Sequence, residues 1–308
     1  MDIKLFFIVL CILITLILLY LVLQLGRNES FSNPRQEIIN KKPYDSFYAP
    51  IYSVLISDQV VDKTKFEVKD LLKVTRLKEF QNAKLLDIGA GGGDHLMLFA
   101  KKEMPNLELT ALDSSKYMLA ETRKRFNNKK VDSTNVRFLH RSVHEEDLFM
   151  QGTFSHITCY YFTMYQVKLK KTLKNIHSWL RPGGWFVVHV VDLDKFDPIL
   201  DAASPFVGTT LQRYTKNRIT ESKVHFKNFT YLSNFTHKKL KSGKEKAYFD
   251  ETFKYHKEPI IKKQRHDLNA FTTNDFVKQM TKLSFDLKHT TNLKSLNYPF
   301  QYILYFQK

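Results

Sequence analysis

Residues 84–94 read KLLDIGAGGGD, and this stretch decides the fold. Its first five residues form the short apolar run typical of a buried strand, and residues 94–102 have a helical pattern. Four of the chain's ten glycines lie between the two, at position 89 and at 91–93. Glycine allows positive φ and lets a ligand approach the backbone, and the next helix offers free N–H groups at its start. The stretch therefore predicts a strand, a ligand-binding loop and a helix.

Strand-like and helix-like segments alternate through much of the chain. Besides 84–88, strands are expected at residues 107–112, 136–139, 154–162, 185–191, 285–288 and 301–306. Stretches with a helical pattern, such as 115–126, lie between them. A repeated strand-then-helix order is typical of a mostly parallel, doubly wound sheet. We expect an α/β fold with a seven-stranded main sheet.

The pattern changes after Asp192. Residues 223–235 and 247–255 alternate apolar and polar side chains around a turn at 241–244. Such alternation predicts strands that are half-buried, and the turn predicts that they pair antiparallel. We therefore expect an antiparallel hairpin within an insertion that spans about 195–265.

A dinucleotide site is the first alternative for the glycine loop. That site requires a third glycine, which would fall at position 94, and this chain has Asp94 there. Asp87 at the strand end also places a carboxylate beside the loop, which suits a cationic amino acid group better than a pyrophosphate.

The segment resembles the first motif of class I S-adenosylmethionine-dependent methyltransferases. In that family the glycine loop packs against the methionine part of the cofactor, and the acid, here Asp87, helps to hold its amino group. A second acid at the end of the next strand binds the ribose hydroxyls. Residues 109–115, LTALDSS, match this motif and place Asp113 in that role. Met118 falls where the family often has an apolar residue near the adenine.

Two further segments carry the resemblance, which is strong from Lys84 to Asp192. Residues 179–188, WLRPGGWFVV, are similar to the family's turn and fifth strand. The third strand differs, because Ser142 stands where an acid usually contacts the adenine amino group. The resemblance implies S-adenosylmethionine as cofactor, with contacts from Asp87, Gly89, Ala90, Gly91, Gly93, Asp113, Ser114, Met118, Ser142, Val143 and Tyr160.

The methyl acceptor should lie beyond the carboxyl ends of the fourth and fifth strands, where open α/β sheets bind ligands. Candidate catalytic residues there are Tyr165, His189 and Asp192. The sequence favours a buried, hydrogen-bonded histidine at His189 over a functional one. The fourth strand lacks the Asn/Asp-Pro-Pro-aromatic signature of amino-methylating DNA enzymes, and Thr158 precedes Cys159 where cytosine C5 enzymes have Pro-Cys.

Three functions remain open. The first is a methyltransferase that acts on a small molecule, a lipid-like acceptor or a membrane-proximal protein. The second is a nucleic-acid methyltransferase that uses the basic surface, and the third is a non-catalytic protein with this fold. The net charge of +17 suits anionic lipid or nucleic acid, but the lysines are also consistent with an ordinary solvated surface. The two cysteines, Cys11 and Cys159, lie far apart, so we expect no disulfide framework and no metal site.

Residues 5–25 form an uncharged run of 21 residues rich in Leu, Ile and Val. At about 1.5 Å per residue this run can cross a bilayer core of about 30 Å, and no small-residue cleavage site follows it. We expect residues 1–26 to be a single transmembrane anchor, 27–42 a tether, and 43–308 the methyltransferase domain. More basic residues follow the run than precede it, which predicts a cytosolic domain, whereas sequons at Asn28, Asn228 and Asn234 argue weakly for the opposite side.

Apolar side chains from Tyr44 to Leu55 follow helical spacing, at Tyr44, Phe47, Tyr48, Ile51, Tyr52 and Leu55. This face predicts a helix packed on the core, an aromatic lid over a ligand pocket, or both.

Overall fold

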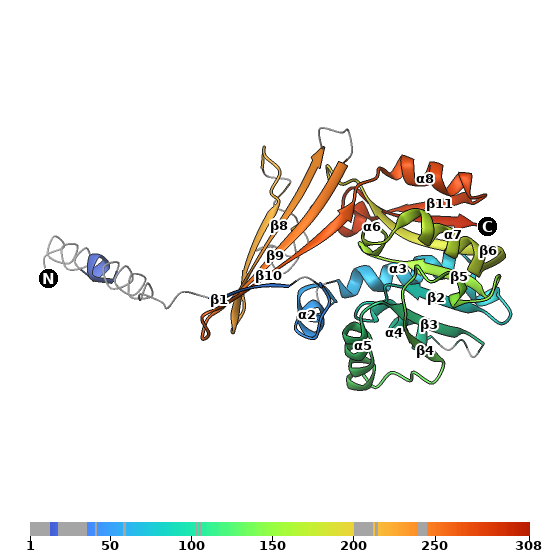
Figure 1. Ribbon diagram of the computed structural model, residues 1–308, viewed down its shortest axis with the longest axis horizontal. Coiled ribbons are helices and arrows are strands. Elements are labelled where there is room, and N and C mark those ends of the chain that lie inside the picture. The colour runs from blue at the N-terminus through green and yellow to red at the C-terminus, as the bar shows by residue number, and fades with distance from the viewer. Residues whose placement is uncertain are drawn as a thin grey trace, which may run out of the picture.

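The structure is a computed structural model that describes residues 13–17, 36–40, 42–57, 60–102, 104, 106–199, 212, 215–239 and 245–308. Within these ranges the chain forms two sheets with helices around them (Figure 1).

The main sheet has seven strands, as the sequence predicts. Its order is β11-β12-β6-β5-β2-β3-β4, and β12 runs antiparallel to both of its neighbours while β2 to β6 are parallel. The strands are β2 (Lys84–Ile88), β3 (Glu108–Asp113), β4 (Val136–His140), β5 (Phe154–Cys159), β6 (Leu180–Val191), β11 (Asp286–Asn292) and β12 (Gln301–Gln307). The expected doubly wound, mostly parallel sheet is therefore confirmed.

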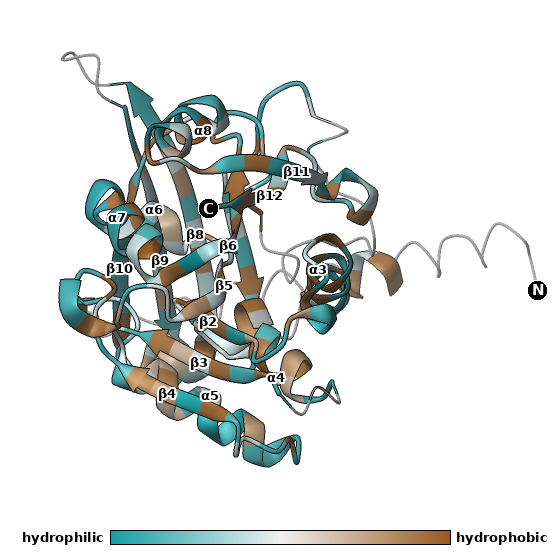
Figure 2. Cartoon of the chain, turned by 90° about the vertical axis from the view of Figure 1, so that its right-hand side faces the viewer, coloured by the Kyte–Doolittle hydropathy of each residue, from teal (hydrophilic) through white to brown (hydrophobic). Residues whose placement is uncertain are grey.

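Helices cover both faces of this sheet. Apolar side chains along each strand point alternately to one face and the other, so each face has its own core to cover. Along β2, Leu85 belongs to one apolar cluster, whereas Leu86 and Ile88 belong to the other. Figure 2 shows hydrophobic segments on inner strands such as β3 and more hydrophilic surfaces on outer helices such as α8. The helices are α3 (Val61–Val74), α4 (Asp94–Ala100), α5 (Lys116–Asn128), α6 (Thr163–Gln166), α7 (Leu169–Trp179) and α8 (Thr273–Lys282), with short helical turns η2 (Leu77–Glu79), η3 (Glu146–Leu148) and η6 (Leu293–Leu296).

The insertion is larger than the single hairpin that the sequence predicts. It contributes β7 (Glu221–His225), β8 (Phe229–Lys239), β9 (Glu245–Tyr255) and β10 (Ile260–Asn269), each antiparallel to the next. The expected strand at 223–235 is in fact two strands, β7 and β8, joined by a turn at 226–228. The sequence did not indicate this turn because only Lys227 and Asn228 separate Phe226 from Phe229, which is too short a polar stretch to mark a turn.

The fifth strand of the second sheet comes from the segment expected to be a tether. Residues Gln36–Asn40 form β1, which pairs parallel with β10 at the sheet edge. The main chain therefore joins the insertion before it enters the helix α2 (Tyr48–Tyr52) and the π-helical turn η1 (Ser53–Ser57). A small apolar cluster that contains Tyr48, Leu55, Tyr231 and Phe253 packs α2 and η1 against the second sheet.

The expected membrane anchor, residues 5–25, lies mostly outside the described residues. Only Leu13–Ile17 of that run are described, and they are helical. Among the residues that the structure describes, no helix combines the length and the apolar character needed to span a bilayer.

Candidate functional site

The glycine loop after β2 is fixed to the next strand by backbone hydrogen bonds. The N–H groups of Gly89 and Ala90 donate to the Leu112 carbonyl at 2.8 and 3.2 Å. Gly89 and Gly91 have φ of 67° and 55°, the left-handed region that favours glycine. The loop therefore bends tightly at the carboxyl end of the sheet, beside the end of β3.

Helix α5 holds the loop from its other side. Thr122 Oγ1 donates to the Gly91 carbonyl at 2.6 Å, and Arg125 Nη1 donates to the Gly92 carbonyl at 2.6 Å. Arg125 also binds Asp94 at 2.7 Å. Two buried side chains thus satisfy loop carbonyls that would otherwise lack partners, which makes the loop rigid before any ligand binds.

Asp113 connects the loop to the start of α5. Its Oδ2 accepts the Gly91 N–H at 3.1 Å, and its Oδ1 accepts the Ser115 N–H at 2.8 Å. Burial raises the pKa of Asp113, and the two N–H donors counter part of that effect. Each carboxylate oxygen has a second lone pair, so Asp113 can still accept two hydroxyl protons from a vicinal diol.

A cavity of about 200 Å³ opens above the loop and Asp113. Seven of the residues that the sequence assigns to the cofactor line it: Gly89, Gly91, Asp113, Ser114, Met118, Ser142 and Val143. The lining fits S-adenosylmethionine, because the Asp113 carboxylate keeps lone pairs for further hydrogen bonds beside the glycine backbone of the loop, and Met118 adds an apolar wall. Here Asp113 would hold the ribose and Met118 would contact the adenine.

Four other expected cofactor residues lie behind this cavity instead of lining it. Asp87 is buried and accepts the Thr158 hydroxyl at 2.7 Å. A Cβ on Gly93 would meet the side chain of Thr122, so this glycine permits close packing of α5 on the loop. Tyr160 stacks on His95 with ring centroids 3.8 Å apart. Ala90 is buried beneath the loop.

The sequence missed several residues that line the cofactor cavity. They are Tyr44, Tyr52, Ile88, Leu112, Arg141, His144, Thr163, Gln166 and Val167. For Tyr44 and Tyr52 the signal was the helical spacing of aromatic residues, which allowed a lid as well as a core face. Both readings hold, because the side chains pack on the core and also cover a cavity.

A second cavity of about 170 Å³ adjoins the first. Tyr44, Tyr52, Thr163 and Gln166 line both cavities and so form their common wall. The rest of the second lining is mostly apolar or aromatic and includes Tyr48, Leu55, Ile56, Val60, Phe162, Phe196, Phe235, Phe249, Leu268 and Tyr298. We call it the aromatic cavity.

Of the three candidate catalytic residues, only His189 lines the aromatic cavity. Its Nε2 lies 3.1 Å from Gln301 Oε1, and burial together with nearby Lys63 lowers its pKa to about 3. His189 is therefore a neutral hydrogen-bonding group at neutral pH. Tyr165 is buried against Phe271, and its hydroxyl bonds the backbone of Val191.

Asp192 also lies away from the aromatic cavity. Its N–H donates to the Phe300 carbonyl at 2.9 Å, and its carboxylate lies 3.7 Å from Lys195 Nζ at the surface. The position of Asp192 at the end of β6 therefore did not bring its side chain to the cavity. The chain turns at 192–196 and directs this side chain to the surface.

Lys63, Glu67 and His95 form a buried polar cluster, of which Lys63 lines the aromatic cavity. Glu67 lies 3.2 Å from Lys63 Nζ and 2.7 Å from His95 Nε2. Burial would raise the pKa of Glu67, but Lys63 and His95 outweigh that effect and lower it to about 2. The Lys63 ammonium also lies over the ring of Tyr161, with 4.3 Å to the centroid.

We expect Asp113→Asn to weaken S-adenosylmethionine binding at least about tenfold, because a charged hydrogen bond to a ligand contributes about 1.5–3 kcal/mol. The side chain keeps its size, so the domain should still fold. Isothermal calorimetry measures the affinity, and the exposed Asp132→Asn serves as the matched control. Unchanged affinity in Asp113→Asn would refute the ribose assignment.

Asp87 should make stability depend on pH in the acidic range. Burial raises its pKa from 3.8 to about 6, so the folded chain binds a proton that the unfolded chain releases. Stability therefore falls as pH rises from about 4 to about 6 and stays lower above that range. Asp87→Asn cannot titrate, so at pH 8 the ligand-free variant should be more stable than the wild type, by up to about 3 kcal/mol.

Urea denaturation at pH 4, 5, 6 and 8 measures this difference, with the exposed Asp62→Asn as control. A gap between Asp87→Asn and the wild type that does not grow between pH 4 and 6 would show that Asp87 keeps an ordinary pKa.

Comparison with known proteins agrees with this geometry. A family model described as a methyltransferase domain matches residues 79–257, more than half of the chain. The juvenile hormone acid O-methyltransferase of Drosophila melanogaster is 31% identical over 101 residues, which are 32% of this chain and 33% of that protein. The match thus spans only about a third of that relative.

Solved structures show the same fold at low identity. An S-adenosylmethionine-dependent methyltransferase from Clostridium acetobutylicum is 17% identical, with a TM-score of 0.57 over 85% of this chain and 97% of that one. A sugar N-methyltransferase from Streptoalloteichus is 14% identical, with a TM-score of 0.58 over 91% of this chain and 99% of that one. The chain belongs to the class I methyltransferases, enzymes whose methyl donor is S-adenosylmethionine.

Proposed function

We propose that this enzyme transfers a methyl group to an oxygen atom of a small apolar molecule that binds in the aromatic cavity. The position of that cavity carries the proposal. It meets the cofactor cavity along one wall, made by Tyr44, Tyr52, Thr163 and Gln166, so a molecule in it lies next to the bound donor.

The lining of the aromatic cavity favours an apolar acceptor. Burying apolar surface contributes about 25 cal/mol per Å², so side chains such as Ile56, Phe162 and Phe249 would stabilise a hydrocarbon or aromatic body. A nucleic-acid strand would instead need an extended basic groove for its phosphates. Lys63, the cationic side chain of this lining, is already paired with Glu67.

In this reaction the protein mainly has to align the acceptor with the methyl donor. The bound cofactor supplies a sulfonium methyl group, which is already electrophilic. The enzyme has to hold a nucleophilic atom in line with that group and exclude water, and the lining of the aromatic cavity would serve both needs. An oxygen acceptor is favoured by the name of the Drosophila relative, an acid O-methyltransferase, whose similarity covers part of the chain.

Purified enzyme with methyl-labelled S-adenosylmethionine should label small apolar probes such as 4-butylphenol, 1-octanol or decanoic acid. Ile56→Trp fills the aromatic cavity without touching the cofactor cavity, so it should reduce product at least about tenfold and leave cofactor affinity unchanged. Leu287→Trp, at an exposed position on β11, is the control. Label that enters only RNA or protein, or equal product from Ile56→Trp, would contradict the proposal.

We also propose that residues 5–25 anchor the enzyme in a membrane, with the catalytic domain in the cytosol. The uncharged run of 21 residues and the basic residues after it support this placement. An apolar acceptor would partition into the same bilayer. The full chain should sediment with membranes after carbonate washing, and a chain that lacks residues 1–26 should stay in the supernatant; a full chain in the supernatant would rule out the anchor.

A further inference from the structure

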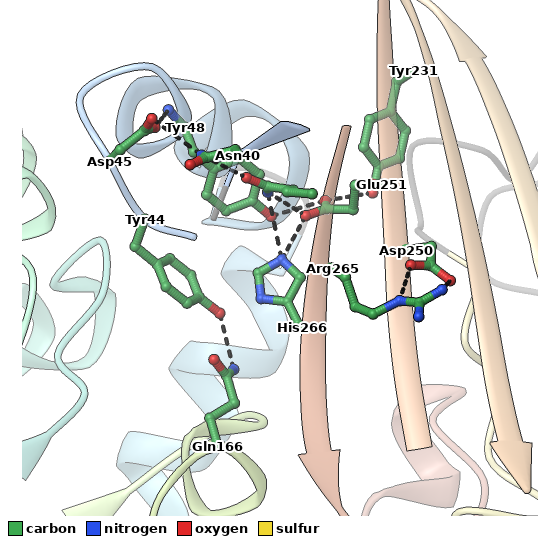
Figure 3. Close-up of polar contacts among 11 residues, drawn as sticks. Asn40, Tyr44, Asp45, Tyr48, Gln166, Tyr231, Asp250, Glu251, Arg265 and His266 are labelled. Atoms are coloured by element: carbon green, nitrogen blue, oxygen red, sulfur yellow. Dashed lines mark hydrogen bonds and ion pairs between the residues drawn. The ribbon is translucent and has the colours of Figure 1, made fainter. Parts of the chain in front are cut away.

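The second sheet contains a buried carboxylate beside the aromatic cavity. Glu251 on β9 is only 1% exposed. The hydroxyls of Tyr48 and Tyr231 donate to its Oε1 at 2.9 and 2.7 Å. Gln264 Nε2 donates to its Oε2 at 2.6 Å, and His266 Nε2 lies 2.7 Å from the same oxygen (Figure 3).

This arrangement favours a proton on His266 Nε2. An ionised carboxylate is tolerated in a protein interior only when hydrogen-bond donors surround it, and Glu251 has three donors besides His266: Tyr48, Tyr231 and Gln264. With the carboxylate ionised, the proton between Glu251 Oε2 and His266 Nε2 must belong to the imidazole. Neutral His266 therefore has a hydrogen on Nε2 and a free lone pair on Nδ1.

The Nδ1 lone pair faces the wall that the two cavities share. His266 lines the aromatic cavity, and its ring centroid is 5.3 Å from that of Tyr44, a residue of the wall shared with the cofactor cavity. Figure 3 shows the second ring nitrogen on the side of Tyr44 and Gln166, turned away from Glu251. A base at this point can reach a polar group of a molecule held between the two cavities.

From this geometry we infer that His266 is the general base of the reaction and Glu251 its positioning residue, so that the acceptor is an apolar alcohol or phenol. This inference rests on the proposed function and narrows its acceptor class. The hydroxyl proton moves to His266 Nδ1. The acceptor oxygen then bonds the methyl carbon while the bond from that carbon to sulfur breaks, leaving its electron pair on sulfur.

The carboxylate of Glu251 stabilises the imidazolium that forms, and the proton passes to solvent when the product leaves. A carboxylic acid acceptor, by contrast, is already ionised at neutral pH and needs no base. An alcohol or phenol acceptor should therefore need His266, whereas a carboxylate acceptor should not. Matched probes can test this difference.

The test compares 4-butylphenol, 4-butylanisole and 4-butylbenzoate, which share one apolar body. With S-adenosylhomocysteine bound, the wild type should bind the phenol at least about tenfold more tightly than the anisole, because only the phenol donates a hydrogen bond to Nδ1. His266→Gln keeps a donor for Glu251 but removes the base. The His266→Gln variant should bind phenol and anisole equally well. It should methylate the phenol at least about 100-fold more slowly than the wild type, with unchanged affinity for S-adenosylhomocysteine.

His237→Gln is the matched control, because His237 also lies in the second sheet and contacts a carboxylate, with Nδ1 2.8 Å from Asp194. It does not line the aromatic cavity, so its activity should equal that of the wild type. Equal binding of phenol and anisole by the wild type, or equal phenol methylation by His266→Gln, would overturn the inference. Benzoate methylated independently of His266 would also overturn it and leave the proposed function standing.

Nitrogen-15 NMR of the wild-type enzyme tests the proton position without any acceptor. The inference requires a protonated Nε2 and an unprotonated Nδ1 on neutral His266, and Glu251→Gln should disturb that signature. A wild-type His266 with its hydrogen on Nδ1 would overturn the assignment, whatever the activity measurements show.

Discussion

The hydrogen bonds of Asp113 hold the cofactor side of this enzyme together. Its carboxylate joins the Gly91 N–H of the loop to the Ser115 N–H at the start of α5. Because α5 in turn holds the loop carbonyls through Thr122 and Arg125, strand, loop and helix form one rigid unit. A carboxylate buried this way is costly in the absence of a ligand, and hydroxyl donors from a bound ribose would reduce that cost.

The second sheet gives this domain its acceptor cavity. The main sheet by itself would be open at the carboxyl ends of its parallel strands. Here β8, β9 and β10 stand beside that opening (Figure 1). The segment 44–52, which includes helix α2, bridges the two sheets, since Tyr48 packs on Phe253 while Tyr44 and Tyr52 line the cofactor cavity. The substrate side and the cofactor side are therefore closed by the same short segment.

Buried acidic and basic side chains gather at two places beside the aromatic cavity. Lys63, Glu67 and His95 form one cluster, and Glu251 with His266 forms the other. Glu251 is surrounded by four polar groups, and Glu67 lies against Lys63 and His95. Such partners are the condition under which a protein interior tolerates an ionised carboxylate. The aromatic cavity is otherwise apolar, so these few polar groups would set the orientation of a bound ligand more than its affinity.

The sequence by itself determined the doubly wound sheet, the glycine loop and the position of Asp113, because these features depend on residues close together in the chain. Local periodicity and the chemistry of glycine are visible without any tertiary contact. The same local signals placed Gly93 and Tyr160 at the ligand, whereas the structure uses them for packing against Thr122 and His95.

Only the tertiary structure decided the substrate side. Tyr48 and Glu251 come together across 203 residues of sequence, and His266 joins them through a strand pairing that no local pattern specifies. The strand β1 was likewise hidden, because five residues of ordinary polarity become a strand only when β10 offers a free edge. Side-chain direction at a strand end, as at Asp192, depends on the turn that follows and so also required the fold.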